Sequence, residues 1–166
     1  LCNKLFAKKL FQDLKMDTSI KINEDLLMNY YLFASAESAV FEDWCPYHYI
    51  VRATSASRAK MNDHKIYDPI RVKEIIRKSA DGELYEDAQR AYINTCINTY
   101  HALLLAGKEL DEDRHKVRNL LKGEQAHFTM LGKKRSLMAR LIVAAPWFYK
   151  SLYWFYSRFL QKNVYS

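Results

Sequence analysis

Glycine and proline are scarce in this chain, with four glycines and three prolines among 166 residues. Because these residues supply most tight turns, their scarcity favours long helices over a fold of many short strands. Cysteine is scarce too: Cys2, Cys45 and Cys96 form no CxxC pair and no Cys/His spacing typical of zinc sites. Unpaired thiols of this kind indicate a reducing compartment.

The sequence also lacks an uninterrupted apolar run long enough to cross a membrane. Its most apolar segment, residues 137–160, is interrupted by Arg140, Lys150 and Arg158. A spanning helix is therefore not expected. The chain nevertheless has 49% hydrophobic and 14% aromatic residues, which predicts a folded core and excludes a disordered segment.

Acidic residues are absent from the last part of the chain. Residues 133–166 hold seven Lys and Arg residues without any Asp or Glu, so the net charge of +7 arises there and the rest is neutral. Aromatic residues interspersed with these cations suit the headgroup region of an anionic membrane. A helix buried against the rest of the chain or a second subunit explains them equally well. Nucleic acid is not expected, because no recognised binding motif accompanies the dispersed basic residues.

Four residues of this tail are the candidates for membrane or partner contact. Trp147 and Trp154 are seven residues apart, which places them two helical turns apart on one face. Lys150 and Arg158 can extend their charged ends outward while their stems cover apolar surface.

Periodicity along the chain predicts an α+β fold that is mainly helical. Short β-prone segments fall early, and long helices follow a proline that comes directly after Asp68. The expected strands span residues 18–22, 39–44 and 47–52; the expected helices span 3–14, 24–35, 69–81, 83–106, 111–128 and 136–161, the last broken by Pro146.

Four motifs follow one another in the first third of the chain. They are Asn3-Lys4-Leu5-Phe6, Asn23-Glu24-Asp25, Tyr47-His48-Tyr49 and the Ser/Thr-rich segment 53–58. In order and spacing they resemble the later half of the catalytic domain of family-2 glycosyltransferases, which have the A-type nucleotide-sugar fold. The resemblance implies that the chain begins within a domain. It divides the chain into a catalytic portion, residues 1–60, whose short strands end that domain, and a helical extension, residues 61–166.

The resemblance assigns the catalytic role to Glu24 and Asp25. An inverting transfer needs a carboxylate that accepts the proton of the attacking hydroxyl. In the family an acidic pair at a helix start supplies this base, usually through its Asp. The alternative is structural: Asn23 caps a helix, and the two acids complement its dipole.

The same resemblance suggests how the donor is held. The segment after the second tyrosine suits contact with the diphosphate, although Ile50 and Ala53 depart from the family pattern, which has Arg and Pro there. His48 is either a metal ligand or a strand histidine with one hydrogen bond. The implied phosphate-binding residues are Arg52, Ser55, Ser57 and Arg58.

The Asp-x-Asp motif that binds the metal in relatives is not in this sequence. Asp111-Glu112-Asp113 matches the bare pattern, but it opens an expected helix and is interpreted as an acidic first turn. A divalent cation, Mg²⁺ or Mn²⁺, is therefore expected only in the full-length parent, and no cofactor and no activity are expected in this piece.

The resemblance thus implies part of an inverting glycosyltransferase that uses a nucleotide sugar and a glycan acceptor to build a cell-surface polysaccharide or teichoic-acid-like glycan. It would be cytoplasmic, or peripheral on the inner face of the cell membrane. The alternative is a non-catalytic helical module that binds a partner or a membrane surface. Self-association is left open.

Overall fold

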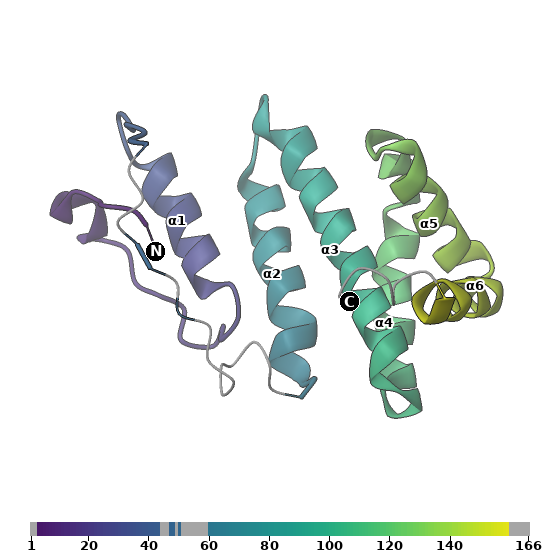
Figure 1. Cartoon of the computed structure of the whole chain (residues 1–166). Helices are drawn as coiled ribbons and strands as arrows, with labels where there is room; N and C mark the ends of the chain where they lie inside the picture. The colour runs from purple at the N-terminus through teal and green to yellow at the C-terminus, as the bar shows by residue number, and fades with distance from the viewer. Residues whose placement is uncertain (1–2, 44–46, 49, 51–59, 160–166) are drawn as a thin grey trace. The chain divides into compact units, whose positions relative to one another are not determined.

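The computed structural model describes residues 3–43, 47–48, 50 and 60–159, and these form helices without any strand. The predicted α+β class is therefore wrong for the described part of the chain. Contacts divide the chain into two compact units, Leu1–Ser79 and Ala80–Ser166. The helices, labelled in Figure 1, are η1 Lys8–Phe11, α1 Glu24–Ala34, α2 Asp63–Ser79, α3 Leu84–Ala106, η3 Lys108–Leu110, α4 Asp111–Gly123, η4 Gln125–Met130, α5 Lys133–Ala144 and α6 Pro146–Phe159.

The predicted strand at residues 18–22 is a turn followed by an irregular segment. The Asp17 carboxylate accepts hydrogen bonds from the amide and the hydroxyl of Ser19, at 2.9 and 2.6 Å, which closes the turn. The amides of Lys21 and Ile22 donate to the Asp68 carboxylate, at 2.7 and 3.2 Å. A side chain therefore takes the donors that a partner strand would have used.

The other two predicted strands are also wrong wherever the structure describes them. Residues 39–43, 47–48 and 50 have no regular secondary structure, and they are exposed. Alternating β-prone residues favour a strand only when a neighbouring strand takes up their backbone hydrogen bonds. The described residues supply no such neighbour.

The helix predicted at residues 3–14 is reduced to the single 3-10 turn η1. Its hydrogen bonds have the short i to i+3 spacing, as from the Leu10 amide to the Ala7 carbonyl at 3.0 Å. Phe6, which the apolar pattern placed on a helix face, instead contacts Phe33 of α1 edge to face, with ring centroids 5.5 Å apart.

The first unit is built on α1 and α2, which lie side by side in Figure 1. α1 confirms the helix predicted from residue 24. Burial of apolar surface between these helices stabilises the pair. Ile20, before α1, is buried in the same cluster, so the approach to α1 is part of the core. The buried members of this cluster are Ile20, Leu27 and Val72, and Leu26, Tyr31, Ile75 and Ile76 pack against them.

α2 begins at Asp63, six residues before the start at Pro69 that the sequence predicted. Asn62 caps the helix, because its Oδ1 accepts the Lys65 amide at 3.0 Å and its carbonyl accepts the Ile66 amide at 3.0 Å. Pro69 therefore lies inside α2, where it has no amide to donate. Asp68 is 5% exposed and is free to bind another segment instead of capping the helix.

The second unit is a bundle around α3, which confirms the long helix predicted there. α3 ends at Gly107, whose φ of +120° suits glycine. Arginines of α4 satisfy carbonyls at the ends of neighbouring helices: Arg114 donates to the Leu103 and Gly107 carbonyls, and Arg118 donates to those of Ile142 and Val143. The buried core comprises Tyr92, Ile93, Cys96, Ile97, Tyr100, Leu103, Val117, Leu121, Phe128, Leu131, Ala139, Ile142, Val143 and Tyr149.

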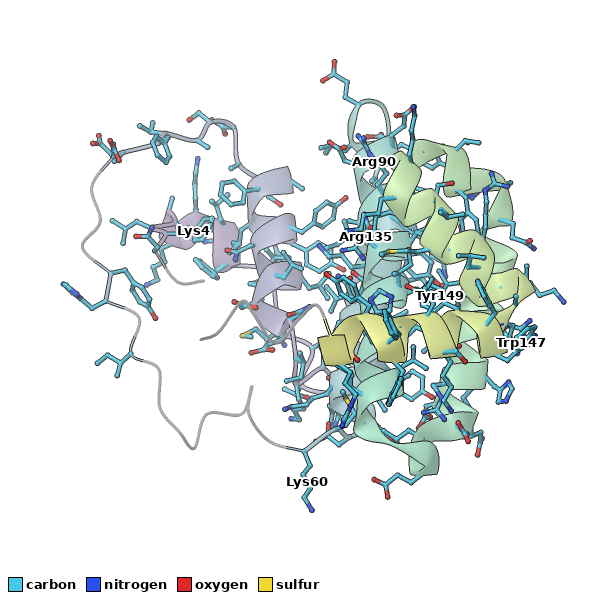
Figure 2. All side chains as sticks on the ribbon, turned by 45° about the vertical axis from the view of Figure 1, so that its right-hand side comes forward. Lys4, Lys60, Arg90, Arg135, Trp147 and Tyr149 are labelled. Atoms are coloured by element: carbon cyan, nitrogen blue, oxygen red, sulfur yellow. The ribbon has the colours of Figure 1, made fainter. Side chains whose placement is uncertain are left out.

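The predicted break of the last helix at Pro146 is confirmed. α5 ends at Ala144, and α6 begins with Pro146 at its first position, where a missing amide costs nothing. α6 then runs across the direction of α3 and α5, as Figures 1 and 2 show. The predicted domain boundary at residue 60 follows a family resemblance, whereas the two units are defined by contacts, so that boundary stays a prediction.

Candidate functional site

Glu24 and Asp25 form the first turn of α1. Asp25 is exposed and Glu24 is half-buried. Asn23 precedes them in the left-handed region, at φ 66° and ψ 17°, and its side chain makes no capping hydrogen bond. Asn23 nevertheless occupies the N-cap position, where its carbonyl accepts the Leu27 amide at 3.2 Å, and both acids lie in the first turn, as the structural alternative predicts. The turn presents an accessible carboxylate beside backbone amides that favour negative charge.

The segment leading into this turn is fixed by Asp68 of α2. Besides the amides of Lys21 and Ile22, the same carboxylate oxygen lies 3.0 Å from Nδ1 of His64, one turn earlier on α2. A buried carboxylate with several hydrogen bonds is a strong anchor, because charge-assisted bonds exceed neutral ones. The two anchored amides lie two residues and one residue before Asn23, so the bond to α2 holds the segment that leads directly into α1.

A second contact holds the same segment on its exposed side. Arg71 of α2 donates to the Ser19 hydroxyl at 3.0 Å and to the Asp17 carboxylate at 3.3 Å. The hydrogen bonds from Ser19 lower the pKa of Asp17, and the Arg71 charge acts in the same direction. Sequence reasoning missed Asp68, His64 and Arg71. The spacing of His64 and Asp68, one helical turn, was the available signal.

The remaining residues of the predicted donor site are not assembled by the structure. His48 is exposed and has no regular secondary structure. In the described ranges no group of three or more His, Cys, Asp or Glu residues is arranged to hold a metal ion. The predicted phosphate-binding residues Arg52, Ser55, Ser57 and Arg58 lie outside the described residues.

A stack of aromatic rings joins α6 to α3, and sequence reasoning did not foresee it. The His101 ring of α3 contacts those of Tyr149 and Tyr153 of α6, with centroids 5.8 and 4.6 Å away, and the two tyrosine rings contact each other at 6.3 Å. Its Nε2 is 2.7 Å from the Tyr149 hydroxyl. Burial, with the Arg135 charge, lowers the pKa of His101 to about 4, so the ring is neutral at pH 7. Burial likewise raises the pKa of Tyr149 to about 12.

The rest of α6 leaves its aromatic side chains exposed. Trp147 is 74% exposed, Trp154 59% and Phe155 55%. Figure 2 shows Trp147 projecting from the edge of the unit and Tyr149 turned inward. Arg158 lies over the Trp154 ring, 5.7 Å from its centroid. These three rings are therefore not buried against the rest of the described chain, and their burial by a second subunit stays a prediction.

Asp111, Glu112 and Asp113 occupy the first turn of α4, as predicted. No helix of the described residues is long and apolar enough to traverse a bilayer, which agrees with the sequence prediction. No protein-family model, curated protein or solved structure matches the chain.

Proposed function

We propose that this chain is part of an inverting glycosyltransferase in which Asp25 is the catalytic base. Asp25 accepts the proton of an acceptor hydroxyl while that oxygen forms a bond to the anomeric carbon of a nucleotide sugar. The bond from the anomeric carbon to the diphosphate breaks, and the nucleoside diphosphate leaves with the electron pair. A positioned base of this kind contributes about 10²- to 10⁴-fold in rate.

The observation that carries the proposal is the exposed Asp25 carboxylate in the first turn of a helix whose entry is anchored by Asp68. A base must be accessible to the acceptor and held in place. The exposure of Asp25 and the anchored segment before α1 support the proposal on these two points. The strands expected with the family resemblance are absent from the described residues. The proposal therefore rests on the order of the motifs and on α1, and not on a sheet.

For the nucleotide-sugar donor, we propose the binding residues that the family resemblance implies. Glu24 adjoins the base, and the diphosphate is held by Arg52, Ser55, Ser57 and Arg58. Mg²⁺ or Mn²⁺ would neutralise the leaving group in the full-length parent, with His48 as a ligand. The acceptor is a glycan of a cell-surface polysaccharide or a teichoic-acid-like polymer.

The test compares Asp25→Asn with Asp13→Asn in the full-length parent. Asp13 is another exposed carboxylate of the first unit. Release of nucleoside diphosphate from a panel of nucleotide sugars measures kcat and KM. Loss of the base should lower kcat by about 10²-fold or more while the donor KM changes little. The Asp13 variant should retain its kcat. Normal turnover in Asp25→Asn would remove Asp25 from the role.

A second function is favoured by α6: contact with an anionic membrane surface. Exposed Trp147, Trp154 and Phe155 lie on a helix that also carries Lys150 and Arg158, in a segment without acids. Aromatic rings at headgroup depth and cations beside them are the two attractions that hold a helix on a bilayer. We propose that this helix holds the parent protein peripherally on the inner face of the cell membrane.

Vesicle sedimentation tests this second function. The chain should bind vesicles of phosphatidylglycerol and not those of phosphatidylcholine, and added salt should weaken the binding. Replacing Trp147 and Trp154 together by Ala should reduce binding by about tenfold or more. Leu84 of α3 and Leu120 of α4 are exposed apolar residues outside α6, so their replacement by Ala is the control. Salt-independent binding, or equal loss in the control, would contradict the proposal.

A further inference from the structure

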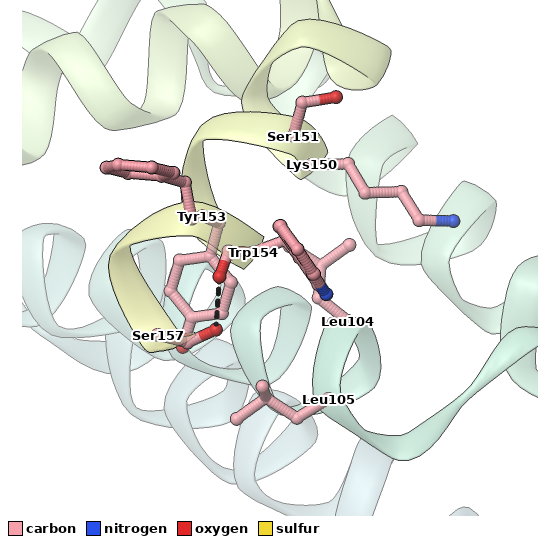
Figure 3. Close-up of a pocket in the computed structure, with 8 residues that line it drawn as sticks. Leu104, Leu105, Lys150, Ser151, Tyr153, Trp154 and Ser157 are labelled. Carbon is pink, nitrogen blue, oxygen red and sulfur yellow. Dashed lines mark hydrogen bonds between the residues drawn. The ribbon is translucent and has the colours of Figure 1, made fainter. Parts of the chain in front are cut away.

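A groove lies between α6 and the end of α3. It has a volume of about 540 Å³, within the range of roughly 300–1,000 Å³ typical of small-molecule sites. In Figure 3 the Trp154 ring lies against Leu104, and Leu105 lies close by. The Ser157 hydroxyl donates to the Trp154 carbonyl at 2.9 Å, so this hydroxyl is occupied. The groove therefore offers mainly apolar surface.

A smaller hollow of about 140 Å³ adjoins this groove, and the two share Leu104 and Lys150 in their walls. The smaller hollow is basic. Its lining includes Arg118 and Lys150 together with an ion pair between Arg114 and Asp111. Asp111 is thus engaged by Arg114. Arg118 donates to two neutral carbonyls, which leave its positive charge uncompensated.

Lys150 stands where the apolar groove meets the basic hollow. Its side chain extends away from Trp154 in Figure 3, so its stem borders the groove and its ammonium group lies beyond it. Lys150 is exposed and belongs to the acid-free segment 133–166. An apolar groove that ends in uncompensated positive charge is complementary to a molecule with an apolar chain and an anionic head.

We propose that the groove binds one anionic phospholipid, with an acyl chain against Leu104, Leu105 and Trp154 and the headgroup phosphate toward Lys150 and Arg118. This site deepens the proposed membrane function, on which it rests, because a helix lying on the bilayer brings the groove to the lipid. Bulk attraction explains binding to any anionic surface. The groove adds a stoichiometric site for a single lipid molecule.

The test is native mass spectrometry of the whole 166-residue chain with phosphatidylglycerol or phosphatidylcholine of the same acyl chains. Phosphatidylglycerol should give an adduct of one lipid per chain, and phosphatidylcholine should bind about tenfold less. Comparable adducts with both lipids would overturn the proposal. A lipid-independent dimer in place of an adduct would also overturn it and would assign the groove to a second copy of the chain.

Matched variants locate the lipid. Lys150→Glu and Leu105→Gln should each reduce the adduct by about tenfold. Lys134→Glu and Leu137→Gln make the same chemical changes at exposed positions on α5 and should leave the adduct within about twofold. Leu105 is 62% exposed, so its replacement does not disturb a core. Equal losses in the control variants would mean that the lipid binds elsewhere.

Vesicle sedimentation of the same variants separates the two proposals. If Leu105→Gln loses the single-lipid adduct but still binds phosphatidylglycerol vesicles, the groove and the membrane surface are both supported. If the unsubstituted chain binds these vesicles and forms no adduct, the groove proposal fails alone. If it forms the adduct and does not sediment with vesicles, the groove stands and the membrane proposal fails.

Discussion

Different kinds of contact stabilise the two units of this protein, each taken by itself. In the first unit, polar contacts fix the segment that leads into α1, and the central one is the buried Asp68 carboxylate. In the second, apolar packing dominates, and α6 is attached through the rings of His101, Tyr149 and Tyr153. The comparison indicates separate tasks. A polar anchor fixes the segment that leads to the carboxylate proposed as the base, whereas an aromatic attachment leaves Trp147, Trp154 and Phe155 of α6 exposed.

The largest effect is expected from Asp68→Asn, which removes the charge from the anchor of the first unit. The free energy of opening at the Lys21 and Ile22 amides should fall by about 3 kcal/mol, because two charge-assisted hydrogen bonds are weakened. Amide hydrogen exchange measures this opening. Asp63→Asn, an exposed carboxylate in the first turn of the same helix, should change it by less than about 1 kcal/mol.

Amides of α5 should keep their exchange rates in Asp68→Asn, because their protection comes from the second unit. Loss of protection throughout the chain would show that the two units do not differ in the way described. Unchanged exchange at Lys21 and Ile22 would show that Asp68 is not the anchor.

A somewhat smaller effect is expected from pH, and it falls on the second unit. The pKa of His101 is about 4 in the folded protein, below the usual 6.5, because the ring is buried and near Arg135. Between these values the unfolded chain binds more protons, so stability is present above pH 6.5 and falls as pH drops toward 4. The loss should be about 2 kcal/mol after allowance for solvent screening of the partly exposed ring.

Urea unfolding between pH 7 and pH 4.5, followed by near-UV circular dichroism, measures this loss. His101→Gln keeps a polar partner for the Tyr149 hydroxyl and removes the titrating group. Its stability should depend less on pH over this interval. An equal pH dependence in the variant would assign the effect to other groups.

The sequence predicted those helices whose ends are marked locally. Residues Glu24 and Asp25 in a first turn, the glycine after Ala106 and the proline after Ala145 are all signals within one helical turn. The start of α2 was wrong because the prediction took its signal from Asp68-Pro69, whereas Asn62 accepts the Lys65 amide and Asp68 is buried. The residues next to Asn62 and Asp68 in the sequence do not show which of the two precedes the helix.

The anchor itself could not have been predicted, since its partners are 46 and 47 residues apart. The β-prone residues before α1 predicted a strand because alternation records which side chains suit a sheet, and not whether a neighbouring strand exists. In α6, aromatic residues occur on every face, so periodicity could not say which were buried. Only the packing against His101 singles out Tyr149, which is 3% exposed, from its neighbours.

If the two units perform separable tasks, two variants of the full-length parent should lose different properties. Turnover with soluble substrates and sedimentation with phosphatidylglycerol vesicles are measured for Asp25→Asn and for the double variant Trp147→Ala, Trp154→Ala. Asp25→Asn should lose about 10²-fold in kcat and sediment normally, and the double variant should lose sedimentation and keep its kcat. If either variant loses both properties while remaining folded by circular dichroism, the two tasks are not separable.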